Sequence, residues 1–240
     1  MGFLPGKVVT VNEPYVVDAL AEAAVAEIQP GMVVGVGTGK TCARAVLALA
    51  NRVRDEGLVV HCVPTSHVTE TLARSQRLNV LDFALVEKVD YLFDGADEID
   101  EEFRMLKGLH GAIARQRLVA RVASRRVYVV GHNKFVHQIG TKATLPVAIM
   151  PFAMAAIRSE LRNLGLSGVV RRSLTGELFL TDHAHLILDV MMGGRDPHQL
   201  ADALDHVPGV VEHGLFLEEA DEVLVEHADG SVERRIRQQG

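Results

Sequence analysis

The chain has 240 residues, enough for one large domain or two modest ones. Hydrophobic residues make up 48% of it, so a substantial core can form, and its formal net charge of -6 argues against a general nucleic-acid or anionic-membrane surface. Aromatic residues are only 5% and tryptophan is absent, which disfavours stacking platforms for bases. Two cysteines without metal-ligand spacing, no secretory leader and no long apolar run predict a reduced, cytoplasmic protein.

Strands and helices alternate through the first part of the chain. Apolar runs predict strands over residues 32–36, 58–63, 79–81, 91–93 and 127–130. Apolar residues at helical spacing predict helices over residues 17–28, 42–54, 68–76 and 109–124. This alternation predicts an α/β fold, with a mostly parallel sheet and helices on both faces. Residues 1–14, which Pro5 and Pro14 interrupt, are expected to be irregular.

The pattern changes after Pro146. Helices are predicted over residues 152–164 and 197–207, and hairpin-forming strands over 169–172, 178–181 and 185–191. Apolar strands over 210–217 and 223–226 are expected to rejoin the large domain. The prediction is therefore a small α+β domain of residues 146–208, inserted into a large domain of residues 1–145 and 209–240. Residues 233–240 are polar and expected to be frayed.

A glycine-rich loop follows the first predicted strand and leads into a helix. Such a loop places backbone N–H groups and a helix N-terminus around a phosphate. The nucleotide-hydrolase motif G-x-x-x-x-G-K-[ST] would need glycine at Val34, and the dinucleotide motif G-x-G-x-x-G would need glycine at Lys40, so both fail. A phosphate-sized anion site with a lysine at its rim remains possible, as does a tight turn without a ligand.

Four acids follow the strand that ends at Phe93, namely Asp94, Asp97, Glu98 and Asp100. Ligands of open α/β sheets bind at the carboxyl ends of the strands. Carboxylates clustered there repel one another unless a cation, a proton or a polar ligand relieves them. The acids therefore indicate a polar ligand site, and a solvated acidic turn is the alternative.

Six stretches follow one another along the chain: Gly35-Val36-Gly37-Thr38-Gly39, Asp94-Gly95-Ala96-Asp97-Glu98, Leu106-Lys107-Gly108, Leu145-Pro146-Val147, Thr181-Asp182, and Gly209-Val210-Val211-Glu212-His213-Gly214-Leu215-Phe216. In this order they resemble the ribose-5-phosphate isomerase A family, over about residues 17 to 230. The resemblance implies a Rossmann-like domain with a small ferredoxin-like domain inserted near the C-terminus.

The resemblance also implies an aldose–ketose isomerase of the pentose phosphate pathway, which interconverts ribose 5-phosphate and ribulose 5-phosphate through an enediolate. It implies no metal and no other cofactor, a small phosphorylated sugar as the ligand, and a homodimer or homotetramer. Nucleic acid and membrane are not expected as partners, as the composition already indicates. The implied substrate-binding residues are Thr38, Gly39, Lys40, Thr41, Asp94, Gly95, Ala96, Asp97, Lys107, Gly108, Leu109, His110 and Lys134.

The family's motifs also imply individual roles. Asp94 and Asp97 would bind sugar hydroxyls and assist ring opening, Lys107 would lie beside the developing enediolate, and Lys134 would be a substrate-binding cation. One carboxylate can both remove and return the proton in such a reaction.

The chain departs from the family pattern at the base itself. Gln116 occupies the position of the catalytic glutamate, and a neutral amide cannot carry the proton. Positioned acid–base catalysis contributes about 10²–10⁴-fold to a rate. Leu109 and His110 replace two glycines, and Lys40 replaces a serine.

Two interpretations follow from these departures. In the first, the protein is a divergent isomerase in which another group is the base. His110 is the candidate, since an imidazole has an unperturbed pKa of about 6.5, and Asp94 or Asp97 could also serve. In the second, the protein binds a sugar phosphate without catalysis, and Gln116 donates hydrogen bonds to the sugar. A nucleotide kinase is a third, more distant possibility.

Overall fold

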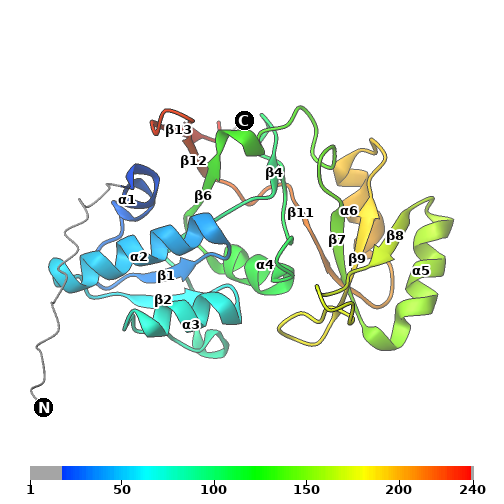
Figure 1. Cartoon of the computed structure of the whole chain (residues 1–240), viewed down its shortest axis with the longest axis horizontal. Helices are drawn as coiled ribbons and strands as arrows, with labels where there is room; N and C mark the ends of the chain where they lie inside the picture. Colours follow the sequence, from blue (N-terminus) through cyan, green and yellow to red (C-terminus); the bar gives the residue numbers. More distant parts are fainter. Residues whose placement is uncertain (1–17, 239–240) are drawn as a thin grey trace, which may run out of the picture.

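The computed structural model describes residues 18–238, and the irregular segment expected over residues 1–14 lies outside them. A six-stranded sheet forms the larger part of the molecule (Figure 1). Its strands, in spatial order, are β13 (Val232–Ile236), β12 (Glu222–Glu226), β6 (Arg126–Gly131), β3 (Tyr91–Asp94), β1 (Val33–Val36) and β2 (His61–Pro64). All neighbours are parallel except β13, which runs antiparallel to β12.

The order of the parallel strands creates a crevice between β1 and β3. From β1 the chain moves outward to β2 and then returns to β3 on the other side of β1. Loops that leave β1 and β3 therefore diverge to opposite sides, and ligands of doubly wound sheets bind at this switch point. Both the glycine-rich loop and the acidic turn begin there.

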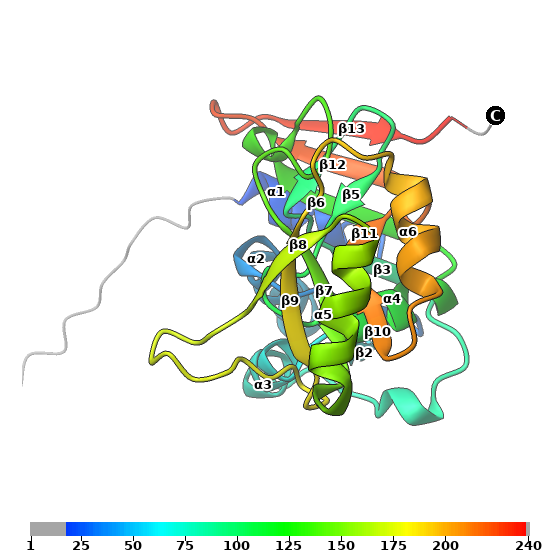
Figure 2. The same cartoon turned by 90° about the vertical axis from the view of Figure 1, so that its right-hand side faces the viewer.

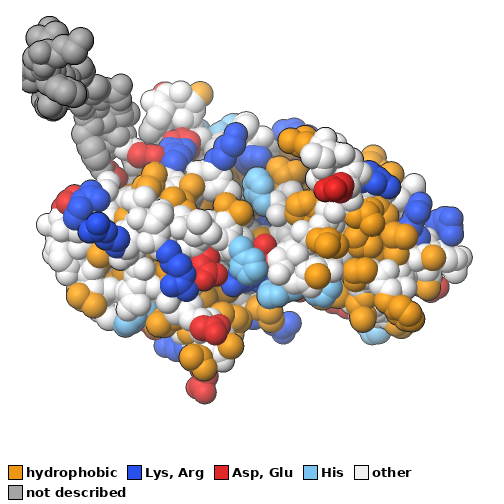
Figure 3. All heavy atoms as spheres, turned by 60° about the horizontal axis from the view of Figure 1, so that its bottom comes forward, with side chains coloured by type: hydrophobic (Ala, Val, Ile, Leu, Met, Phe, Trp, Pro, Cys, Tyr) orange, Lys and Arg blue, Asp and Glu red, His pale blue; other side chains and the backbone are white. Residues whose placement is uncertain are grey.

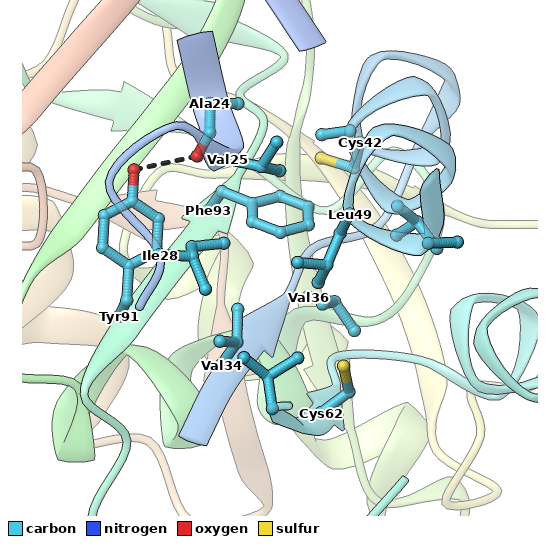
Figure 4. Close-up of a cluster of buried hydrophobic side chains, with 14 of the residues drawn as sticks. Ala24, Val25, Ile28, Val34, Val36, Cys42, Leu49, Cys62, Tyr91 and Phe93 are labelled. Carbon is cyan, nitrogen blue, oxygen red and sulfur yellow. Dashed lines mark hydrogen bonds between the residues drawn. The ribbon is translucent and has the colours of Figure 1, made fainter. Parts of the chain in front are cut away.

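Helices cover both faces of the large sheet. The helices of this region are α1 (Ala19–Val25), α2 (Lys40–Asp55), α3 (His67–Ser75) and α4 (Ile113–Val122). On one face, Val34, Val36 and Phe93 pack with side chains of α1 and α2, and the hydroxyl of Tyr91 donates to Ala24 O at 2.9 Å (Figure 4). On the other face, Leu92 packs against α4. The predicted parallel sheet with two covered faces is confirmed.

A second, four-stranded sheet lies beside the first, at the right of Figure 1. The unit that contains this sheet comprises, in chain order, β7 (Leu145–Ile149), α5 (Met154–Asn163), β8 (Ser167–Val170), β9 (Leu186–Met191), α6 (Pro197–Asp205) and β10 (Val210–His213). The order β10-β7-β9-β8 and the antiparallel pairing are those of a ferredoxin-like β-α-β-β-α-β unit. Figure 2 shows α5 and α6 on the same side of this sheet.

A three-stranded sheet joins the two units. It pairs β4 (Glu98–Ile99), β5 (Met105–Leu106) and β11 (Leu215–Phe216). Short 3-10 helices cover Phe83–Leu85, His132–Lys134 and Pro151–Ala153. Among the described residues, no helix is long and apolar enough to cross a membrane, and no three potential metal ligands lie together.

Several predicted elements differ from the structure. The expected return of residues 210–217 to the large sheet is wrong for β10, because Val210 and His213 pair with β7. Residues 79–81 and 178–181 form isolated bridges instead of strands. The expected fraying after residue 233 is wrong up to Ile236, since β13 pairs along β12. The helix predicted from Leu109 begins only at Ile113.

The turn before α4 has a local cause. Gly108 and Gly111 have φ angles of +112° and +76°, values that a right-handed helix cannot contain. A β-carbon on Gly111 would lie 2.4 Å from Phe179 Cε1, so any residue with a side chain would clash at this position. Leu109 and His110 therefore lie on an exposed turn, outside the helix.

His213, buried beside β11, is expected to make the fold sensitive to acid. Leu215 N donates to its Nδ1, and Asp205 Oδ1 lies 3.2 Å from its Nε2, so the neutral ring satisfies both neighbours. Burial lowers the pKa of His213, with Glu212 opposing that effect. The unfolded chain, in which the pKa is about 6.5, then binds more protons below that pH, and stability falls as the pH falls further.

Urea unfolding between pH 7.5 and pH 5 would measure this loss. His213→Asn keeps an acceptor for the Leu215 N–H and cannot be protonated, so its stability should change less over this range. The exposed His198 provides a control, His198→Asn, which should retain the wild-type pH dependence. Equal slopes for wild type and His213→Asn would contradict the expectation.

Candidate active site

The N-terminus of α2 faces the crevice with its backbone donors available. Gly39 is the N-cap residue, with φ +116°, and no side chain caps this end. The first N–H groups of a helix have no partners within it, and they carry partial positive charge. Lys40 occupies the first helical position, where the helix dipole disfavours a cation by about 0.3–1 kcal/mol. Within residues 18–238, its ammonium group has no ion-pair partner. A bound anion would therefore interact favourably with both the Lys40 ammonium and the N–H groups of the α2 N-terminus.

Thr38 fixes the loop before this helix. Its N–H donates to Asp94 Oδ1 at 3.1 Å, and its hydroxyl donates to Ser66 Oγ at 2.8 Å. The hydroxyl also lies 2.8 Å from Thr65 Oγ1. These contacts attach the loop to β3 and to the start of α3. The Thr38 side chain is therefore occupied by the protein, and the α2 N–H groups are the donors that remain.

Asp94, at the end of β3, is fully buried and surrounded by donors. Gly95 N donates to its Oδ1 at 2.8 Å, and Lys107 Nζ lies 3.0 Å from its Oδ2. Gln116 Nε2 lies 3.1 Å from Oδ2 and 3.3 Å from Oδ1. Lys107 and Gln116 are themselves buried, with 2% and 5% of their surface exposed. A buried ion pair needs such additional hydrogen bonds to offset the loss of hydration.

Gln116 replaces a charge with a donor at this position. A glutamate in the same place would bring a second carboxylate within about 3 Å of Asp94, where one of the two would hold a proton. The amide has the shape of that protonated carboxyl group, and its N–H is attracted to Asp94. The side chain is therefore held against Asp94 and does not line the cavity described next.

A cavity of about 530 Å³ lies in front of this buried trio. Its lining comes from the ends of β1, β3, β6 and β12 and from the turn before α4. The lining residues are Thr38, Gly39, Lys40, Thr41, Cys42, Gly95, Ala96, Asp97, Leu109, His110, Val129, Val130, Gly131, Asn133, Lys134 and Glu226. Figure 3 shows histidine side chains gathered between the two halves of this face of the molecule.

Asp97 and His110 are two of the groups in this cavity lining that can transfer protons. Asp97 Oδ2 accepts the Leu109 N–H at 2.8 Å, which leaves Oδ1 for a ligand. A β-carbon added to Gly39 would lie 3.5 Å from His110 Nε2, so the imidazole lies beside the anion loop. Lys134 lines the cavity from the 3-10 helix after β6. The arrangement thus combines an anion-binding end with a carboxylate and an imidazole.

The structure separates the predicted site residues into two groups. Most of the predicted substrate-binding residues line the cavity together. Asp94, Lys107, Gly108 and Gln116 do not line it. Lys107 Nζ donates to the carbonyl of Gly95, so the buried trio lies directly behind that lining residue. Asp94 and Lys107 therefore lie behind the cavity lining, and their direct contact with a ligand stays a prediction.

Six lining residues were missed from the sequence, and three of them, Cys42, Asn133 and Glu226, have polar side chains. Asn133 follows β6, whereas Glu226 is the last residue of β12 and pairs with Arg44 of α2. Their position at the carboxyl end of a strand could have marked them as candidates. The sequence did not reveal that β12 pairs with β6, which brings both residues to the same cavity. Cys42 also lines the cavity, with its Sγ 3.7 Å from Asp94 Oδ1. Burial raises the pKa of the Cys42 thiol, and Asp94 adds to this shift.

Tyr128, behind the site, is expected to tolerate loss of its hydroxyl. This group is buried and has no hydrogen-bond partner among the described residues, whereas the ring lies 5.2 Å from Lys107 Nζ. Tyr128→Phe keeps the ring and removes an unsatisfied polar group, so the free energy of unfolding should rise by about 1–2 kcal/mol. Tyr91→Phe is the matched control in urea unfolding, because it removes a made hydrogen bond and should lower stability by about 0.5–1.5 kcal/mol. A stability loss in Tyr128→Phe would contradict the expectation.

The fold and the cavity together define an α/β protein with a ligand-sized cavity, lined by Lys40 and Lys134, at a sheet switch point. A profile of the family described as ribose 5-phosphate isomerase A (phosphoriboisomerase A) matches residues 61–230. The ribose-5-phosphate isomerase A of Sphingopyxis alaskensis is 40% identical over 210 residues, which are 87% of this chain and 91% of that protein. The chain belongs to the ribose 5-phosphate isomerase A family.

Solved structures agree with this assignment. Ribose 5-phosphate isomerase A from Methanocaldococcus jannaschii superposes with a TM-score of 0.86 and 33% identity, covering 90% of this chain and 96% of that one. A D-ribose-5-phosphate isomerase in complex with phospho-erythronic acid superposes with a TM-score of 0.87 and 28% identity, covering 92% and 97%. The predicted Rossmann-like fold with a small ferredoxin-like unit is thereby confirmed.

Proposed function

We propose that the protein interconverts ribose 5-phosphate and ribulose 5-phosphate, with the phosphate at the N-terminus of α2. The observation that carries this proposal is the cavity itself. It brings the uncapped helix N-terminus, Lys40 and Lys134 to the same space as Asp97 and His110. A phosphate held by helix N–H groups and two lysines would fix the sugar by its non-reacting end. The related isomerase that binds phospho-erythronic acid supports a phosphorylated acyclic ligand.

The reaction moves a carbonyl group between C1 and C2. A base removes the proton from C2 of the open-chain aldose, and the electrons form an enediolate. The hydroxyl proton passes from O2 to O1, and the first proton returns to C1, which leaves the carbonyl at C2. In this proposal Asp97 and His110 are the proton-transferring groups, since both line the cavity and Asp94 does not. Lys107 stabilises the enediolate by its charge from behind Gly95, a role that needs no direct contact.

A coupled assay with ribose 5-phosphate tests the proposal. Wild type should show turnover, and His110→Ala or Asp97→Asn should reduce kcat by about 10²-fold or more if either group transfers the proton. Lys88→Ala is the control, because Lys88 is exposed and lies outside the cavity. Absence of turnover with wild type, at enzyme concentrations that detect about one event per minute, would overturn the catalytic proposal.

A binding protein without catalysis is the second candidate. The specific observation in its favour is that Gln116 is held against Asp94, where the family pattern has a base. A thermal-shift titration separates the two candidates. Stabilisation by ribose 5-phosphate without turnover would favour binding alone, and no stabilisation by any pentose phosphate would contradict both candidates.

The expected homodimer or homotetramer stays a prediction. Figure 3 shows hydrophobic side chains gathered over the half of the molecule that holds the four-stranded sheet. Phe152 and Met191 of this unit are 97% and 62% exposed, and large exposed apolar surfaces commonly mark interfaces. Sedimentation equilibrium would measure the association, and a monomer at micromolar concentration would contradict it.

A further inference from the structure

The turn that carries Leu109 and His110 is held from the ferredoxin-like unit. Arg171 follows β8 of that unit, and its Nη1 donates to Gly108 O at 2.9 Å and to Leu109 O at 2.8 Å. Its Nε donates to Asp189 Oδ2 of β9 at 2.9 Å, so the guanidinium plane is fixed by its own sheet. Both partners are mostly buried, with 13% and 17% of their side chains exposed.

These contacts define the orientation of two consecutive peptide units. In the first unit, Arg171 binds the Gly108 carbonyl while the Leu109 N–H donates to Asp97 Oδ2 at 2.8 Å. The peptide between Gly108 and Leu109 is therefore held at both ends, by Arg171 of the ferredoxin-like unit and by Asp97 after β3. In the second unit, Arg171 binds the Leu109 carbonyl, and the N–H of His110 points the opposite way because the peptide is trans.

Packing restricts the same turn on its remaining sides. A β-carbon on Gly108 would lie 2.6 Å from Ile113 Cγ1 and 3.1 Å from Pro146 Cγ, which shows how closely α4 and β7 approach it. Phe179, from the segment between β8 and β9, covers Gly111. Packing thus restricts the backbone of the turn. Arg171 binds its carbonyls at residues 108 and 109, and the Gly111 N–H also donates to Gly108 O at 2.9 Å.

We propose that Arg171 is a positioning residue of the active site: by binding the carbonyls of Gly108 and Leu109, it holds His110 beside the anion loop and Asp97 on the Leu109 N–H. This inference rests on the proposed isomerase function for its kinetic consequence, and it makes the ferredoxin-like unit contribute to catalysis by positioning the turn. Lysine cannot replace Arg171 fully, because one ammonium group lacks the planar fork that binds two carbonyls and a carboxylate together.

Kinetics of Arg171→Ala provide the first test. Displacing catalytic groups by about 1 Å can reduce a rate by about 10²-fold, so kcat should fall by about 10- to 100-fold. KM should stay within about threefold, since Lys40, Thr41 and Lys134 are untouched. The kcat of Arg171→Lys should lie between those of wild type and Arg171→Ala. Millimolar guanidinium should partly restore the kcat of Arg171→Ala. The neighbouring exposed Arg172, which binds Gly176 O, gives the control Arg172→Ala, with unchanged kinetics and no rescue.

Hydrogen exchange of peptides covering residues 107–113 provides the second test, and it needs no activity. Exchange there should accelerate at least tenfold in Arg171→Ala and stay unchanged in Arg172→Ala, with urea midpoints confirming that both are folded. Unchanged exchange, or a wild-type kcat in Arg171→Ala, would overturn the proposal. Accelerated exchange in a protein whose wild type has no turnover would support the positioning and contradict only the proposed function.

Discussion

Replacing Gln116 by glutamate is expected to raise kcat for ribose 5-phosphate isomerisation by about 10²–10⁴-fold, the usual contribution of a positioned acid–base group. The amide of Gln116 is attracted to Asp94 at 3.1 Å and is held behind Gly95 by that bond. A carboxylate at this position would be repelled by Asp94. This repulsion would turn the carboxylate past Gly95 toward the substrate, where it would add a base to Asp97 and His110 of the cavity.

Initial rates across pH 6 to 9 would measure this gain. Gln199→Glu makes the same chemical change at an exposed position of α6 and should leave kcat unaltered. An increase in kcat with little change in KM would place the effect in the chemical step. If Gln116→Glu stays within twofold of wild type, proton transfer does not pass through this position, and Asp97 or His110 is the base.

Replacing Lys107 by methionine is expected to lower the free energy of unfolding by about 3–5 kcal/mol, because the charge of Asp94 would remain buried without its partner. Lys107 Nζ lies 3.0 Å from Asp94 Oδ2, and both side chains are almost completely buried. Gln116 and two backbone N–H groups would still bind the carboxylate, but none of them carries a charge. Isomerase activity should be lost as well, because the enediolate would form without a nearby cation.

Urea unfolding of a double-mutant cycle would isolate the pair. Asp94→Asn combined with Lys107→Met removes both charges and should recover part of the stability that Lys107→Met loses. Lys88→Met is the surface control, since Lys88 lies 3.6 Å from Asp90 and is 69% exposed, and its effect should be within about 0.5 kcal/mol. A small effect of Lys107→Met, similar to that of the control, would contradict the importance of the buried pair.

The sequence was sufficient to place the cavity at the ends of β1 and β3. Parallel strands are buried on both faces, so they appear as continuous apolar runs, and Val33–Val36 and Tyr91–Asp94 stand out for that reason. The glycine loop and the acids follow these runs directly. Local pattern and tertiary structure agree at these positions. The family resemblance implied Thr41 and Asp97 as substrate-binding residues, and both line the cavity.

Other features depend on contacts between distant segments. The turn at Leu109 replaces a predicted helical turn because Gly111 has a left-handed φ and is covered by Phe179, more than sixty residues away. The orientation of Gln116 toward Asp94 is equally non-local. Glu226 joins the cavity only because β12 lies next to β6, an adjacency that strand patterns do not reveal.

The last described strand has a consequence for solubility. β13 covers the outer side of β12, whose residues from Glu222 to Val225 are buried. The central residues of β13 are Glu233, Arg234 and Arg235, and such charges discourage a further chain from adding to an open sheet edge. A chain that ended at Gly230 would expose an apolar strand with unpaired backbone groups, and such a protein is expected to aggregate when it is expressed.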